Sequence, residues 1–174
     1  MCIAGCALVA IAGERRGWAA DFVPESVGVR AAFSWSDSAS GFHSVEAFSN
    51  WDLPWKWDLG SEWLLKPQVA ASAGWLGDSR ADAFLTTLGP ALVIRHGDWP
   101  VSLSVGSSPT LLSRDDFPSK DLGCLFEFTS YAGLNWDVTS HFRIGYRFQH
   151  TSNAGLGSSN PGLNMHAFSV SYVF

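Results

Sequence analysis

Long apolar runs are missing from most of this 174-residue sequence. After residue 20, no stretch has the ~18 consecutive apolar residues that a transmembrane helix needs. No helical periodicity of convincing length is present either. Any membrane-spanning elements must therefore be strands, because only helices and closed barrels satisfy every backbone polar group inside a bilayer.

Basic charge is also scarce. Eleven Lys and Arg residues stand against sixteen Asp and Glu residues, which gives a formal net charge of -5. Binding to nucleic-acid phosphates requires a basic surface, so a nucleic-acid partner is excluded. With 47% hydrophobic and 16% charged residues, the chain is too apolar for disorder. We expect one folded domain over residues 21–174.

Cysteine is nearly absent from the part that we expect to fold. The apolar segment near Met1, followed by small residues, predicts a signal peptide over residues 1–20. No basic segment precedes it, which leaves open whether the natural start lies upstream. Cleavage would remove Cys2 and Cys6, so that Cys124 could form no intrachain disulfide. We expect Cys124 to be a small apolar strand residue rather than a nucleophile.

Aromatic residues are abundant, with nine Trp, twelve Phe and three Tyr, as in the aromatic girdles of membrane barrels. The chain also alternates apolar and polar residues with the two-residue period of strands. Eight such stretches are separated by Gly, Ser, Asp, Asn and Pro clusters: 27–35, 43–52, 61–75, 83–96, 98–106, 124–136, 139–150 and 164–174. This pattern predicts an all-β fold, an eight-stranded antiparallel transmembrane β-barrel.

Membrane and soluble barrels would use these alternating faces in opposite ways. In a membrane barrel the apolar face meets lipid, and charged residues of both signs fill the lumen. That set comprises Arg30, Glu46, Lys66, Arg95, Glu127, Arg143 and Arg147. On a soluble barrel the same set would be a solvated surface. The closing stretch favours the membrane alternative and the cell outer membrane, because Phe168, Val170 and Tyr172 alternate with small residues before a terminal Phe174.

The connection between the last two strands contains candidate catalytic residues. His150 and Ser152 are two apart, so they point to the same side of a strand, as a general base and its nucleophile require. Alternation places both on the lipid-facing side, near the extracellular end and the outer leaflet. Asn164 falls on the same face of the final strand, where its amide could orient the histidine. We expect a Ser-His-Asn site.

These residues also carry a resemblance to a known family. His-x-Ser-Asn-Ala-Gly-Leu from His150, followed by Asn-Pro-Gly at residues 160–162, resembles the lipid A 3-O-deacylase (PagL) family, most strongly over residues 145–174. The resemblance implies a serine esterase that is embedded in the outer membrane and removes the 3-O-linked hydroxyacyl chain of lipid A, within lipopolysaccharide. It assigns Ser152 as the nucleophile, His150 as the base and Asn153 as an oxyanion donor. A homodimer is left open.

One position departs from the family pattern. Where the best-known members have a glutamate to orient the histidine, this sequence has Asn164, which we rank first for that role. The alternatives are acids from other loops, namely Asp37, Asp78, Asp82, Asp115 and Asp116. We expect residues 160–162 to be turn geometry. A competing hypothesis is a non-catalytic structural or adhesive barrel, or an inactive family member.

No cofactor or metal is expected. His, Asp and Glu residues nowhere show metal-ligand spacing, and the sequence contains no Gly-rich phosphate-binding loop. A Gly-x-Ser-x-Gly motif is also missing, which excludes an α/β-hydrolase fold around the serine.

Overall fold

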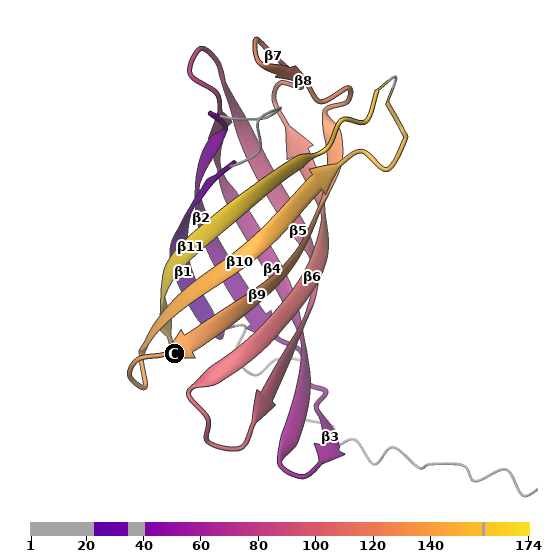
Figure 1. Ribbon diagram of the computed structural model, residues 1–174. Helices are drawn as coiled ribbons and strands as arrows, with labels where there is room; N and C mark the ends of the chain where they lie inside the picture. Colours follow the sequence, from indigo (N-terminus) through magenta and orange to yellow (C-terminus); the bar gives the residue numbers. More distant parts are fainter. Residues whose placement is uncertain (1–22, 35–40, 158) are drawn as a thin grey trace, which may run out of the picture.

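The computed structural model describes residues 23–34, 41–157 and 159–174, which form a β-barrel (Figure 1). Its eight long strands are β1 (Ser26–Phe33), β2 (His43–Asp52), β4 (Trp63–Gly77), β5 (Asp82–His96), β6 (Val101–Leu112), β9 (Phe126–Asp137), β10 (Phe142–Ser152) and β11 (Leu163–Val173). Three short strands accompany them: β3 (Trp57–Gly60), β7 (Asp116–Phe117) and β8 (Lys120–Asp121). The predicted eight strands are confirmed. The predicted signal peptide, with Cys2 and Cys6, lies outside the described residues, as does Asp37.

The barrel closes by antiparallel pairing between consecutive long strands and between the first and the last. β1 pairs with β2 and with β11, the latter from Ser26 opposite Val173 to Phe33 opposite His166. β2 also pairs with β4, and the remaining long strands follow in chain order. Closure leaves no free sheet edge, which a bilayer-spanning sheet cannot have.

The two faces of the sheet follow the predicted alternation. Trp136, Phe168, Val170 and Phe174 are exposed on the outside, where lipid would contact them. Inside, the Nη2 of Arg30 donates to the Oε2 of Glu46 at 2.6 Å, and both side chains are buried.

Most of the other predicted lumen residues are paired as well. Arg95 and Arg143 both pair with Asp137, whereas Lys66 pairs with Asp52 at 2.6 Å nearer the rim. Glu127 and Arg147 are the exceptions, since neither forms a salt bridge among the described residues. The prediction of a polar, mostly paired lumen is confirmed for this set.

The upper part of the lumen contains an apolar cluster, which the alternation did not indicate. Buried side chains from five long strands and two loops form a cluster there: Ala32, Phe42, Leu76, Ala83, Leu85, Leu112, Phe117, Leu122, Leu163, Met165 and Ala167. The rings of Phe42 and Phe117 meet edge to face, with their centroids 5.1 Å apart. Phe117 belongs to the β7–β8 hairpin, which lies at the upper end of the barrel (Figure 1). We call residues 113–125, which connect β6 to β9 and include this hairpin, the cap loop.

Strand β6 is longer than predicted. We expected it to end at residue 106, because Ser107, Ser108 and Pro109 suggest a turn. The structure continues the strand to Leu112, held by β9 through pairs that include Pro109 with Phe128. On its other side, the ladder with β5 is interrupted between Thr87 and Ala91, where prolines at positions 90 and 109 have no N–H to donate.

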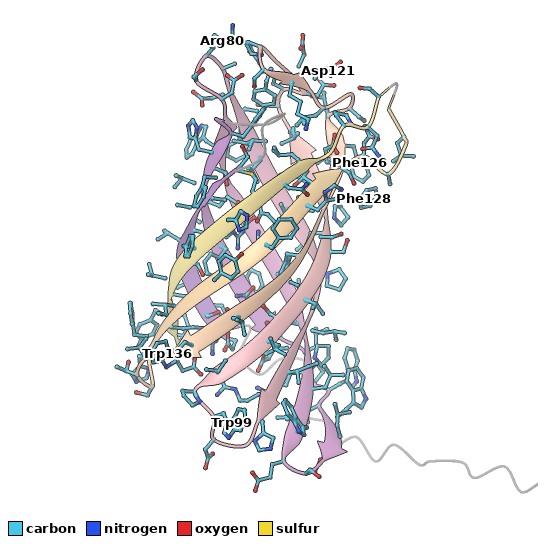
Figure 2. All side chains as sticks on the ribbon, viewed as in Figure 1. Arg80, Trp99, Asp121, Phe126, Phe128 and Trp136 are labelled. Carbon is cyan, nitrogen blue, oxygen red and sulfur yellow. The ribbon has the colours of Figure 1, made fainter. Side chains whose placement is uncertain are left out.

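The two ends of the barrel differ. The C-terminus and the short β5–β6 and β9–β10 connections lie at the lower end in Figure 1, whereas the cap loop and the β10–β11 loop lie at the upper end. Figure 2 shows Trp99 and Trp136 low on the barrel, and Arg80 and Asp121 at the top. Outer-membrane barrels have short periplasmic turns and longer extracellular loops, so the upper end is the extracellular one. No helix of the described chain has the length and hydropathy of a membrane span.

Candidate active site

The candidate residues lie at the extracellular end of two adjacent strands. His150 and Ser152 are among the last three residues of β10, and Asn164 is the second residue of β11. The register places His150 directly opposite Asn164. His150 and Asn164 are exposed on the outward face, and Ser152 is partly exposed. The ladder of the barrel therefore brings the predicted base and its predicted orienting group together on the lipid-facing side.

A short hydrogen bond joins these two side chains. The Nδ1 of His150 lies 2.7 Å from the Oδ1 of Asn164. Because an amide oxygen can only accept, Nδ1 carries the hydrogen in this arrangement. The Nε2 of His150 then keeps its lone pair, and a general base accepts a proton on such a lone pair. Among the described residues, no carboxylate bonds to His150, so Asn164 holds the place that the candidate acids would need.

Among the described residues, no hydrogen bond joins Ser152 to His150. Ser152 is the last residue of β10 and pairs only with Phe128 of β9, because the β10–β11 ladder ends one residue earlier. Within the described part of the chain, its Oγ makes no hydrogen bond. Catalytic serine–histidine bonds are often long without substrate and tighten in the complex. The spacing permits a dyad, and substrate binding would have to close it.

Gly162 touches the histidine ring, a role that the expected turn geometry did not reveal. Its φ is +61°, which favours glycine. A Cβ at this position would lie 2.7 Å from the Cε1 of His150 and 3.4 Å from its Nε2. The absence of a side chain here therefore leaves the space that the imidazole occupies. The Asn-Pro-Gly sequence was the available signal, but only the structure shows which side chain the glycine faces.

The side-chain amide of Asn153 forms hydrogen bonds within the β10–β11 loop and to the cap loop, so it has no free N–H to donate to a ligand. Its side chain is buried, and its Nδ2 donates to the carbonyl oxygens of Leu122 at 3.0 Å and of Ser159 at 2.7 Å. Its Oδ1 accepts from the N–H of Gly155 at 2.9 Å. Both amide hydrogens are thus engaged. We predicted that this amide faces an oxyanion, whereas in the structure it cross-links the β10–β11 loop to the cap loop.

Asn160 was expected to contribute only turn geometry. Its Oδ1 accepts from the backbone N–H of Asn153 at 3.2 Å, which places its amide beside the residue that follows Ser152. The side chain is exposed, and within the described chain its Nδ2 has no hydrogen-bond partner. A donor in this position is available to a ligand at Ser152.

The cap loop is itself anchored to the barrel by Asp78, which lies in the turn between β4 and β5. The carboxylate of Asp78 accepts from the Oγ of Ser119 at 2.7 Å and from its N–H at 3.0 Å. The hydrogen bond from the Ser119 hydroxyl, with others from the backbone, lowers the pKa of Asp78 to about 2. This carboxyl is thus committed to the loop and is not available to His150.

No group of three or more His, Cys, Asp or Glu residues could hold a metal ion in the described segments.

Comparisons with known proteins identify the family of the chain. A family model described as "Lipid A 3-O-deacylase (PagL)" matches residues 43–173. The lipid A deacylase PagL of Bordetella bronchiseptica is 30% identical over 142 residues, which cover 77% of this chain and 79% of that protein. The crystal structure of the outer membrane enzyme PagL has a TM-score of 0.73 at 19% identity, over 86% of this chain and 99% of that one. The last comparison shows a shared fold.

Proposed function

Since the chain belongs to the lipid A 3-O-deacylase (PagL) family, we propose that it is a serine esterase that removes the 3-O-linked hydroxyacyl chain of lipid A. The protein is an outer-membrane β-barrel, and the family supports a deacylase role. The observation that carries the finer proposal is the 2.7 Å contact between His150 Nδ1 and Asn164 Oδ1 on the lipid-facing side, two residues from Ser152.

The proposed reaction begins at Ser152. Its Oγ attacks the carbonyl carbon of the ester, and its proton passes to the Nε2 of His150. When the tetrahedral intermediate collapses, the bond between the carbonyl carbon and the sugar oxygen breaks, and the imidazolium returns the proton to that oxygen. Water then hydrolyses the acyl-serine by the same two steps. Asn164 keeps the ring in the required tautomer throughout.

The developing oxyanion needs a donor that is not already used. The side-chain amide of Asn153 donates to two carbonyl oxygens, so we assign it to loop positioning. The Nδ2 of Asn160 is the better oxyanion donor, because the N–H of Asn153 fixes the other end of that amide. This assignment replaces the expected role of Asn153.

The surroundings of the site suit a substrate that stays in the outer leaflet. Phe128 pairs with Ser152, and its ring packs edge to face on that of Phe126 at 5.1 Å. Figure 2 shows both aromatic side chains near the upper end of β9, close to the β10–β11 loop. An ester at the boundary of head group and hydrocarbon would thus meet Ser152 from the membrane, with its acyl chain against apolar residues.

Mass spectrometry of lipid A tests this function. Cells expressing the wild type are compared with cells expressing Ser152→Ala and, as a matched control, Ser49→Ala, another outward-facing serine on β2. We expect loss of one 3-hydroxyacyl group with the wild type and the control, and none with Ser152→Ala. Intact lipid A in all three cultures, with the barrel folded in the outer membrane, would instead support a non-catalytic or inactive barrel.

A further inference from the structure

A row of polar side chains extends from the site across the lipid-facing surface. The register places Ser130 of β9 opposite His150 and Ser107 of β6 opposite Ser130. Together with Asn164, these residues form one line across four strands. Ser107 and Ser130 are exposed on the outside, and their Oγ atoms lie 2.9 Å apart. We call these two residues the serine pair.

The serine pair is unusual for its place. The outward-facing neighbours of Ser130 on β9 are Phe128 and Ala132, and those of Ser107 on β6 are Val105 and Pro109. A hydroxyl that faces hydrocarbon without a hydrogen bond is unfavourable. One serine can donate to the other, which satisfies one of the two protons. The second proton and several lone pairs are left, in the described structure, for a ligand beside His150.

We propose that the serine pair binds the hydroxyl group on the acyl chain that is removed and so selects hydroxyacyl esters. This inference rests on the proposed function. The hydroxyl of a 3-hydroxyacyl chain is two carbons from the carbonyl that Ser152 attacks. Ser130 lies one strand from His150, and the Cβ atoms of directly opposed residues are about 5 Å apart. Ser107, on the other side of Ser130 from His150, orients the Ser130 hydroxyl through the contact between their Oγ atoms.

Phospholipids are the competing substrates, and a comparison with them indicates how the serine pair would select lipid A. Phospholipids in the same leaflet carry esters of acyl chains without this hydroxyl. When such a chain occupies the site, the second proton of the serine pair is left without a partner in an apolar environment. Sites built to bond a hydroxyl reject analogues that lack it for this reason. The serine pair thereby favours lipid A over esters of chains that lack the hydroxyl.

Two synthetic lipid A analogues that differ only in the hydroxyl of the 3-O-linked chain test the inference. Initial rates in detergent give kcat/KM for each. We expect the wild type to prefer the hydroxylated analogue. Ser130→Ala should lower kcat/KM for that analogue by roughly five- to tenfold and leave the other unchanged. Ser130→Thr, which keeps a hydroxyl, should restore the preference, and Ser49→Ala should alter neither rate.

The outcomes separate this inference from the proposed function. An equal fall on both analogues in Ser130→Ala would show a structural role and overturn hydroxyl recognition. An unchanged ratio between the analogues would also overturn it, while leaving a working deacylase. If the wild type cleaves neither analogue, the proposed function fails, and hydroxyl recognition fails with it.

Discussion

Replacing Gly162 by alanine should move His150, the proposed catalytic base. The added Cβ would lie 2.7 Å from His150 Cε1, whereas ordinary van der Waals contact is 3.4–4 Å, so the ring must shift by about 1 Å. Misplacing a reacting group by this distance can cost about 10²-fold in rate. We expect kcat/KM for lipid A deacylation to fall by about that factor, measured as the initial release of 3-hydroxy fatty acid.

A matched control separates ring displacement from backbone strain. Gly155 also has a positive φ, +83°, but a Cβ there would meet no atom within 4 Å. Gly155→Ala should therefore carry a similar backbone cost, about 1 kcal/mol, with little loss of activity. Equal losses in the two variants would show that strain in the loop, rather than contact with His150, determines the rate. Full activity in Gly162→Ala would refute the reasoning outright.

Two further predictions concern the orienting amide and the cap loop. Asn164→Asp keeps an oxygen near His150 Nδ1 and adds a negative charge, so it should raise kcat/KM roughly three- to tenfold. Asn164→Leu should lower kcat/KM by about as much. Unchanged pH–rate profiles in both variants would show that another group orients the ring. The lowered pKa of Asp78, about 2, means that its ionised form favours the docked loop. That stabilisation is full above the ordinary carboxyl range near pH 4 and is lost as the pH falls toward 2. Hydrogen exchange in residues 113–125, corrected for intrinsic rates, should show this loss, and Asp78→Asn should show weaker protection already at pH 7.

The eight strands could be read from alternation, because side chains along a strand point to opposite faces with a two-residue period. Alternation fits a soluble barrel equally well, and the closing aromatic stretch was the signal that favoured lipid on the outside. The same parity predicted that Asn164 would lie beside His150, since pairing between consecutive strands fixes which residues oppose each other. The prediction was wrong where residues typical of turns lie within a strand. Ser107 to Pro109 look like a turn but are held in a strand by β9.

Features that depend on loop packing were beyond the sequence. Phe117 lies among charged residues, and only the fold shows that it joins the apolar cluster of the upper lumen beside Phe42. Asn153 follows Ser152, and the family resemblance suggested an oxyanion role for it. Its buried amide instead donates to the carbonyl oxygens of Leu122 and Ser159, which no sequence pattern indicated. Alternation assigns a side chain to a face of the sheet, but it does not predict which loop residues pack against that face.

The proposed base and the proposed nucleophile are held by different parts of the molecule. His150 lies within the ladder between β9 and β11, so its position follows from the barrel itself. Ser152 is paired on one side only, and the next residue, Asn153, is fixed to the cap loop through the Leu122 carbonyl. The orientation of the imidazole is therefore as stable as the barrel, whereas the position of the Ser152 hydroxyl depends on loop docking. We therefore expect that the Ser152 side chain, rather than the imidazole, adjusts to form the serine–histidine bond when an ester arrives from the membrane.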